Sequence, residues 1–160
     1  VRYIRARYGL VISEQTAERL KIEIGCALPE EPALTAVAKG RDSMTGLPRA
    51  ITVHSDEICE AIREPLQHVV ELIQQVLEVT PPELSGDIMT EGSCLTGGLA
   101  QLRQLPLLIE RATGIPCHVA ANAHQCVAVG AAKALQYASS FSAVYDLGSF
   151  SYRLSDNVTN

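Results

Sequence analysis

Hydrophobic residues at the start of the chain recur every three or four positions, which predicts amphipathic helices. The pattern covers residues 1–8 and again residues 14–24. Ser13 is a suitable N-cap for the second helix, because its side chain can accept a hydrogen bond from the first turn. Gly25 follows the last turn and suits its C-terminal end. Two helices are therefore expected within the first 24 residues of the chain.

The pattern then changes to short apolar runs at residues 34–37 and 50–53, which predict two strands. The segment between them includes residues 40–48, which read GRDSMTGLP and are rich in residue types that favour turns. We therefore expect an antiparallel hairpin within a small subdomain.

A long helical pattern follows, running from Ser55, the expected N-cap, to about Glu78. Pro65 removes one backbone donor in its middle, which predicts a kink or two abutting helices. The sequence Thr-Pro-Pro at residues 80–82 ends the element.

The last third alternates between strand and helix patterns. Strands are expected over residues 93–96 and 116–120, and helical patterns follow them through residues 102–109 and over 123–138. Such spacing predicts a βαβ unit with parallel strands. Two parallel strands cannot bury such a unit on both faces, so we expect at least one further strand from elsewhere.

Composition narrows the class of protein. The 160 residues are 47% hydrophobic and 19% charged, which excludes a disordered or low-complexity chain. The formal net charge of −5 argues against nucleic acid as a partner, because phosphate binding needs clustered Lys and Arg. No apolar run approaches the roughly 18 residues of a membrane-spanning helix. We expect a cytoplasmic protein.

Cysteine and histidine show no pattern that points to chemistry. The five cysteines are scattered without a C-x-x-C pair, and the four histidines lack metal-ligand spacing. Cys117, His118, His124 and Cys126 could be drawn together as a zinc site, but two fall on an expected strand and two at a helix start. No catalytic triad or carboxylate pair stands out. We predict neither metal-binding nor catalytic residues.

Two features could bind a ligand. Gly97 and Gly98 join a strand to a helical pattern, which lets the backbone approach a nucleotide or phosphate closely. Neither a P-loop nor a G-x-G-x-x-G motif is present, so an ordinary tight turn is the other interpretation. Glu18 and Lys21 lie three residues apart on the expected helix. They could hydrogen-bond a ribose hydroxyl together or form part of a solvated helix face.

Five short motifs, taken together and in their order along the chain, indicate a protein family more specifically than any one of them alone. It comprises ISEQTAERLKIEIG (12–25), GRDSMTGLP (40–48), TPPEL (80–84), LTGG (95–98) and CVAVG (126–130). Together these motifs resemble the MreB/Mbl family of bacterial actin homologues, the rod shape-determining proteins. The resemblance covers roughly residues 1–136 and matches the C-terminal half of the family only.

The resemblance implies an α/β fold, namely the C-terminal half of an actin-like (RNase-H-like) ATPase. Residues 1–80 would form a small, IIB-like subdomain with its connecting helices, and residues 81–138 part of a larger, IIA-like subdomain. Residues 139–160 would be a C-terminal tail. The resemblance also implies that ATP is bound by Glu18, Lys21, Gly97, Gly98, Leu99 and Ala100.

The sequence departs from the family pattern at two places. Leu99 stands where the family usually has a third glycine, and residues 121–124 read Ala-Asn-Ala-His where an acidic residue and a proline are usual. The resemblance places the two phosphate loops and the magnesium environment outside this chain, so we expect the chain alone to be inactive as an ATPase. Residues 145–149 are similar to a phosphate loop, but chance explains them more readily.

The resemblance implies a filament-forming cytoskeletal protein that determines bacterial cell shape. It would associate with itself, with the cell-wall elongation machinery and with the inner face of the membrane. One alternative is a sugar or acetate kinase of the same ATPase superfamily, which shares the Gly-Gly turn; the other is a binding module of the chaperone type. The Thr-Gly-Leu-Pro segment at residues 45–48 favours the first interpretation.

Overall fold

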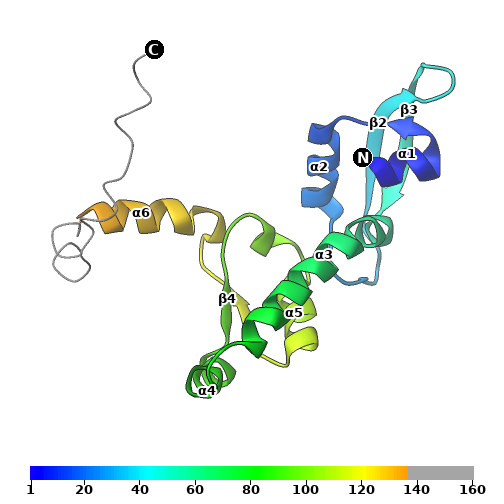
Figure 1. Ribbon diagram of the computed structural model, residues 1–160. Helices are drawn as coiled ribbons and strands as arrows, with labels where there is room; N and C mark the ends of the chain where they lie inside the picture. The colour runs from blue at the N-terminus through cyan, green and yellow to red at the C-terminus, as the bar shows by residue number, and fades with distance from the viewer. Residues whose placement is uncertain (137–160) are drawn as a thin grey trace, which may run out of the picture. The chain divides into compact units, whose positions relative to one another are not determined.

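The computed structural model describes residues 1–136, and these residues divide into two units (Figure 1). Val1–His124 form the first unit, and the second begins at Gln125. The expected tail and the segment 145–149 lie outside the described residues. The elements are, in chain order, α1 (Arg2–Tyr8), β1 (Leu10–Val11), α2 (Glu14–Ile24), β2 (Thr35–Asp42), β3 (Pro48–His54), α3 (Ser55–Glu78), α4 (Pro82–Glu91), β4 (Ser93–Leu95), η1 (Leu99–Gln101), α5 (Leu105–Thr113), β5 (Cys117–Val119), η2 (Ala123–Gln125) and α6 (Cys126–Gln136).

The two N-terminal helices form where the hydrophobic pattern predicts them. Ser13 caps α2, because its Oγ accepts a hydrogen bond of 3.1 Å from the backbone N–H of Thr16. Gly25 ends the helix, but its φ of −67° and ψ of 141° are extended and not left-handed. Glycine is favoured there by space, since a Cβ would lie 2.2 Å from the carbonyl oxygen of Lys21. The helix end was predicted correctly, and its physical cause is a close backbone approach.

The expected hairpin is present, with longer strands than the apolar runs predicted. β2 and β3 pair antiparallel, and β1 pairs antiparallel with the other edge of β2. Gly40 lies within β2 and not in the turn, because it pairs with Arg49 of β3. Glycine is favoured there because a Cβ would lie 2.3 Å from the carbonyl oxygen of Val11. The turn itself is fixed by Asp42, whose carboxylate accepts hydrogen bonds of 3.0 Å from the N–H groups of Met44 and Thr45.

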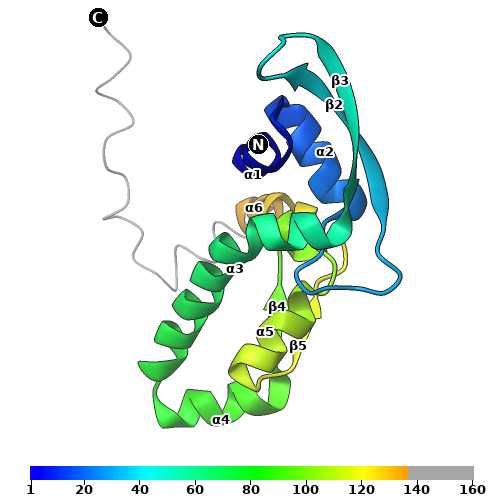
Figure 2. The same ribbon diagram turned by 90° about the vertical axis from the view of Figure 1, so that its right-hand side faces the viewer.

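The long helix α3 is continuous from Ser55 to Glu78, so of the two forms that Pro65 predicted, a kinked helix or two abutting helices, only the second is wrong. Pro65 is accommodated within it, and the helix axis bends part-way along (Figure 2). Ser55 is not the N-cap. His54 holds that position, and its N–H donates to the carboxylate of Glu57 at 2.9 Å. Ser55 is fully buried and accepts a hydrogen bond from the N–H of Leu34 instead.

The expected βαβ unit is present with one difference inside it, and one unpredicted helix, α4, precedes it. β4 and β5 pair in parallel, as predicted. The helix between them is interrupted, because Gln104 adopts a left-handed φ of 62° between the short η1 and α5. α4 was not predicted, although a proline at its first position and Glu83 in its first turn are typical of a helix start.

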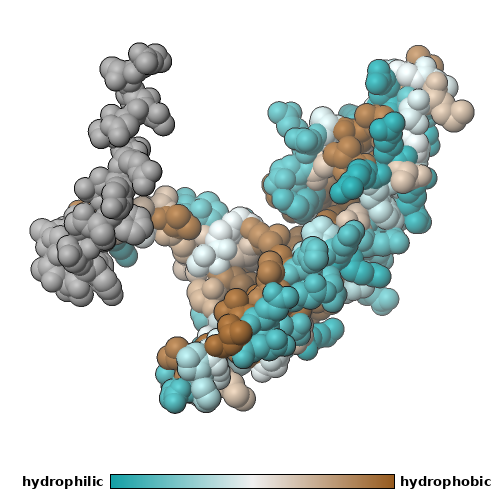
Figure 3. Space-filling view, viewed as in Figure 1, coloured by the Kyte–Doolittle hydropathy of each residue, from teal (hydrophilic) through white to brown (hydrophobic). Residues whose placement is uncertain are grey.

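Two apolar clusters hold the first unit together, and α3 contributes to both. The first cluster joins α1, α2 and the three-stranded sheet and includes Ile58 of α3. The second joins Leu66 of α3 to α5 and the segment before it. Ile62, between these two residues, packs against both clusters. The space-filling view shows apolar side chains gathered beside α3 in this unit (Figure 3). The subdomain boundary expected near residue 80 stays a prediction.

Among residues 1–136, none of the helices combines the length and the apolar character that crossing a bilayer would require.

Candidate nucleotide-binding site

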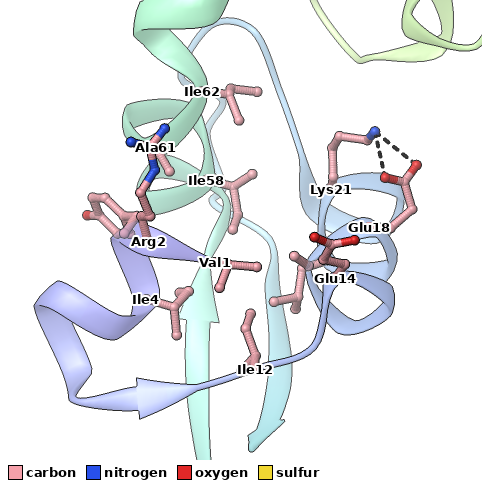
Figure 4. Close-up of a pocket in the computed structure, with 13 residues that line it drawn as sticks. Val1, Arg2, Ile4, Ile12, Glu14, Glu18, Lys21, Ile58, Ala61 and Ile62 are labelled. Atoms are coloured by element: carbon pink, nitrogen blue, oxygen red, sulfur yellow. Dashed lines mark hydrogen bonds and ion pairs between the residues drawn. The ribbon is translucent and has the colours of Figure 1, made fainter. Parts of the chain in front are cut away.

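Glu18 and Lys21 lie on one face of α2 and form an ion pair (Figure 4). The Nζ of Lys21 is 2.9 Å from each carboxylate oxygen of Glu18. The Glu18 side chain is 59% exposed and that of Lys21 41%, so the pair contributes little to stability. Both charged groups can therefore reorganise around a ligand at small cost.

This pair borders two cavities. The first, of about 340 Å³, opens between α1, α2 and α3, and isoleucine side chains such as Ile4, Ile12 and Ile58 give it an apolar lining (Figure 4). The second, of about 380 Å³, has α2 on one side and the segment after β4 on the other. Its volume falls within the range typical of small-molecule sites. It is lined by Glu18, Lys21, Ile22, Gly25, Gly98, Leu99, Gln101, Leu102 and Arg103.

The glycine turn presents bare backbone to open space. Gly97 has a φ of +84°, which side-chain-bearing residues rarely adopt, and its N–H donates to the carbonyl of Ala123 at 2.7 Å. Gly98 has an ordinary φ of −67°. In the described part of the chain, nothing lies within 4 Å of where a Cβ would stand on either residue. A ligand can therefore approach this backbone closely.

The cavity brings together four of the six residues that the resemblance singles out. Glu18 and Lys21 meet Gly98 and Leu99 across it, although about 77 positions separate the two segments in the sequence. Leu99 is 45% exposed and presents an apolar side chain where the family usually has glycine. Gly97 and Ala100 flank the lining residues, and Ala100 is only 4% exposed.

Sequence reasoning missed several lining residues. Ile22 is 72% exposed, and its position off the apolar stripe of Ala17, Leu20 and Ile24, which packs into the first cluster, was a usable signal. Arg103 belongs to no motif, and nothing in its sequence context pointed to the cavity. Cys26 directly follows the cavity residue Gly25, but burial raises the pKa of its thiol to about 11. This thiol stays protonated at neutral pH and behaves as a small apolar group.

Comparison with known proteins decides the family. A family model described as "MreB/Mbl protein" matches residues 1–143, which is most of the chain. The chain belongs to the MreB/Mbl family. Cell shape-determining protein MreB of Escherichia coli (strain K12) is 46% identical over 136 residues, which are 85% of this chain and 39% of that protein. Cell shape-determining protein Mbl of Bacillus subtilis (strain 168) is 44% identical over 128 residues, 80% of this chain and 38% of that protein. The chain thus spans about two fifths of the length of these relatives.

Solved structures of the family show the same fold. The crystal structure of MreB5 of Spiroplasma citri bound to AMPPNP superposes with a TM-score of 0.81 at 30% identity, covering 87% of this chain and 42% of that one. The ADP-bound form of MreB5 gives a TM-score of 0.79 at 32% identity, covering 83% and 40%. The α/β, actin-like fold that the MreB/Mbl resemblance implied is therefore confirmed.

Proposed function

We propose that this chain is the C-terminal half of an MreB-like protein that binds ATP, forms filaments and determines cell shape, and that the 380 Å³ cavity holds part of the nucleotide. One observation carries the proposal. Two distant segments, both of which the resemblance implicates in nucleotide binding, form the walls of one cavity of suitable size. The names of the relatives and the nucleotides bound to MreB5 support it.

The lining residues fit an adenine nucleotide chemically. The Glu18 carboxylate can accept hydrogen bonds from ribose hydroxyls, and the Lys21 ammonium can donate to ribose or phosphate oxygens. The bare backbone of Gly97 and Gly98 would lie near the sugar and the α-phosphate. Leu99 and Ile22, both exposed and apolar, suit the faces of the base. The cavity therefore combines an apolar wall with a few polar groups, as small-molecule sites do.

The rest of the activity belongs to the longer protein. Magnesium and the phosphate loops would be supplied by the part of the protein that the resemblance places outside this chain. In the complete protein, ATP binding would favour contacts between subunits in a filament at the inner face of the membrane, next to the cell-wall elongation machinery. Cosedimentation of the complete protein with and without ATP separates this function from that of a kinase, which would stay in the supernatant in both cases.

A pair of glycine variants tests the nucleotide site in this chain. Gly98 and Gly86 both avoid the left-handed region, and a Cβ on either would meet open space within the described residues. Gly98→Val should therefore fold, yet it would place a side chain where the nucleotide approaches. Gly86→Val makes the same change on α4, away from the cavity. Binding of a fluorescent ATP analogue is the assay, and the absence of tryptophan gives a low protein background.

We expect Gly98→Val to weaken binding at least tenfold, while Gly86→Val binds like the wild type. Lys21→Ala should also weaken binding, with Lys39→Ala on β2 as the matched control. Wild-type affinity in both Gly98→Val and Lys21→Ala would refute the proposed site.

A further inference from the structure

Arg103 joins the two walls of the cavity. It lies in the short segment between η1 and α5, and its backbone forms a parallel bridge with Cys26. The carbonyl of Arg103 accepts a hydrogen bond of 2.8 Å from the N–H of Ala27. The chain that leaves α2 is thus tied by its backbone to the chain that leaves the glycine turn.

The side chain of Arg103 makes a second connection. Its Nε donates to the carbonyl oxygen of Gly25 at 3.1 Å, and its Nη1 lies 2.9 Å from the carboxylate of Glu30. The Arg103 side chain is 33% exposed and that of Glu30 21%, so this ion pair is shielded more than the pairs Arg19–Glu23 and Glu18–Lys21 on α2. Gln104 donates to the other oxygen of Glu30 at 3.1 Å. Gln104 also adopts the left-handed φ of 62°, a conformation that costs energy unless contacts such as these hold it.

These contacts lie close to both walls of the cavity, so they can influence the position of the residues that line it. Gly25 lies four residues after Lys21, and Arg103 lies four residues after Leu99. This junction therefore ties the charged face of α2 to the glycine turn. Lost contacts here would let both walls move without removing any of the residues proposed to contact the nucleotide.

We propose that Arg103 is a positioning residue for the nucleotide site, acting through Gly25 and Glu30 to fix α2 against the glycine turn. This inference rests on the proposed function. Because Arg103 also lines the cavity, a direct contact with the nucleotide is the competing explanation. Glu30 separates the two, since it pairs with Arg103 but does not line this cavity.

The test measures the Kd of a fluorescent ATP analogue for Arg103→Gln, Glu30→Gln, the double variant and Arg103→Lys. Arg49→Gln is the matched control, because Arg49 likewise donates to a backbone carbonyl, that of Tyr8, at 3.1 Å and pairs with a carboxylate, Asp42, at 2.9 Å. Arg49 lies on β3 and lines neither wall of the cavity. Far-UV circular dichroism confirms that each variant is folded at the temperature of the binding assay.

We expect Arg103→Gln and Glu30→Gln each to raise Kd about tenfold, the size of one lost charge-assisted hydrogen bond. The Kd of the double variant should be hardly higher than that of either single variant. The Kd of Arg103→Lys should lie between those of the wild type and Arg103→Gln, and Arg49→Gln should bind like the wild type. Weaker binding in Arg103→Gln with wild-type affinity in Glu30→Gln would overturn positioning in favour of a direct contact. Wild-type Kd in all variants would also overturn it.

A ligand-free measurement keeps this inference separate from the proposed function. In the absence of nucleotide, Arg103→Gln and Glu30→Gln should both shift the amide resonances of Lys21 and Gly98, and Arg49→Gln should leave them in place. If these shifts occur while the wild-type chain binds no ATP, the positioning role stands and the ATP proposal falls. If ATP binds but the resonances do not move, the positioning role falls alone.

Discussion

Gly25→Ala is the substitution for which the structure predicts the clearest effect on both folding and the site. The backbone of Gly25 has φ and ψ angles that alanine adopts freely, so the change brings no conformational strain of its own. Its added Cβ, however, would lie 2.2 Å from the carbonyl oxygen of Lys21 and 3.2 Å from the Cδ1 of Leu102. The first of these contacts involves backbone and cannot be relieved by a rotamer change.

The cost follows from that overlap. The Lys21 oxygen and the new methyl group must separate by about 0.8 Å to reach the shortest contact that real Cβ atoms make. The movement strains the hydrogen bond of 2.9 Å from the N–H of Gly25 to the same oxygen. Overpacking of this kind typically costs about 1–3 kcal/mol. For a chain of this length, the melting temperature should fall by about 2–4 °C for each kcal/mol. Because the displaced atom belongs to Lys21, nucleotide affinity should fall as well.

Gly40→Ala is the matched control. Its Cβ would meet a backbone carbonyl, that of Val11, at nearly the same distance of 2.3 Å, but on the sheet and away from the cavity. Thermal unfolding followed by circular dichroism should show a similar loss of stability in both variants. Binding of the fluorescent ATP analogue, measured well below both melting temperatures, should weaken only in Gly25→Ala. Wild-type stability in Gly25→Ala, or equal losses of affinity in the two variants, would refute the reasoning.

Two further predictions concern acid stability and activity. Burial raises the pKa of the Glu57 carboxyl, but hydrogen bonds from Tyr8 and the His54 N–H, with the charge of Arg7, outweigh it and leave the pKa below its usual value of 4.5. The stabilisation is therefore fully present above pH 4.5 and is lost as the pH falls through the folded-state pKa. In Glu57→Gln, the urea midpoint of unfolding should fall less between pH 6 and pH 3 than in the wild type. Glu60→Gln, exposed on the same helix, is the control and should fall as the wild type does. An equal fall in the wild type and Glu57→Gln would contradict this. The second prediction is that the chain alone releases no more phosphate from ATP than a heat-treated control. Phosphoryl transfer needs a metal, a positioned water and phosphate donors, which the resemblance places outside this chain. Clear turnover would contradict this prediction.

The fold was predictable where local sequence signals and packing agree. The stripe of α2 and the Ser13 cap could be read directly because they depend on neighbours within one turn. The errors arise where contacts between distant segments determine the local structure. Ser55 is a good N-cap by residue type, yet the N–H of Leu34, 21 positions earlier, takes its hydroxyl and the cap moves to His54. Gly40 is a residue type that favours turns, yet its pairing with Arg49 of β3 places it in a strand.

The candidate site likewise has one part that local sequence patterns predict and one part that they do not. Glu18 and Lys21 could be paired from their spacing, and the glycine turn could be recognised from its two glycines, but no local pattern says that these segments share a cavity. That requires the junction at Arg103, whose contacts with Gly25 and Glu30 span more than 70 positions. Motif recognition therefore finds the groups that would touch a nucleotide and misses those that set the distance between them. If Arg103 positions the walls as proposed, the affinity of the site depends on residues with no motif of their own, and variants at this junction should alter it while every motif remains intact.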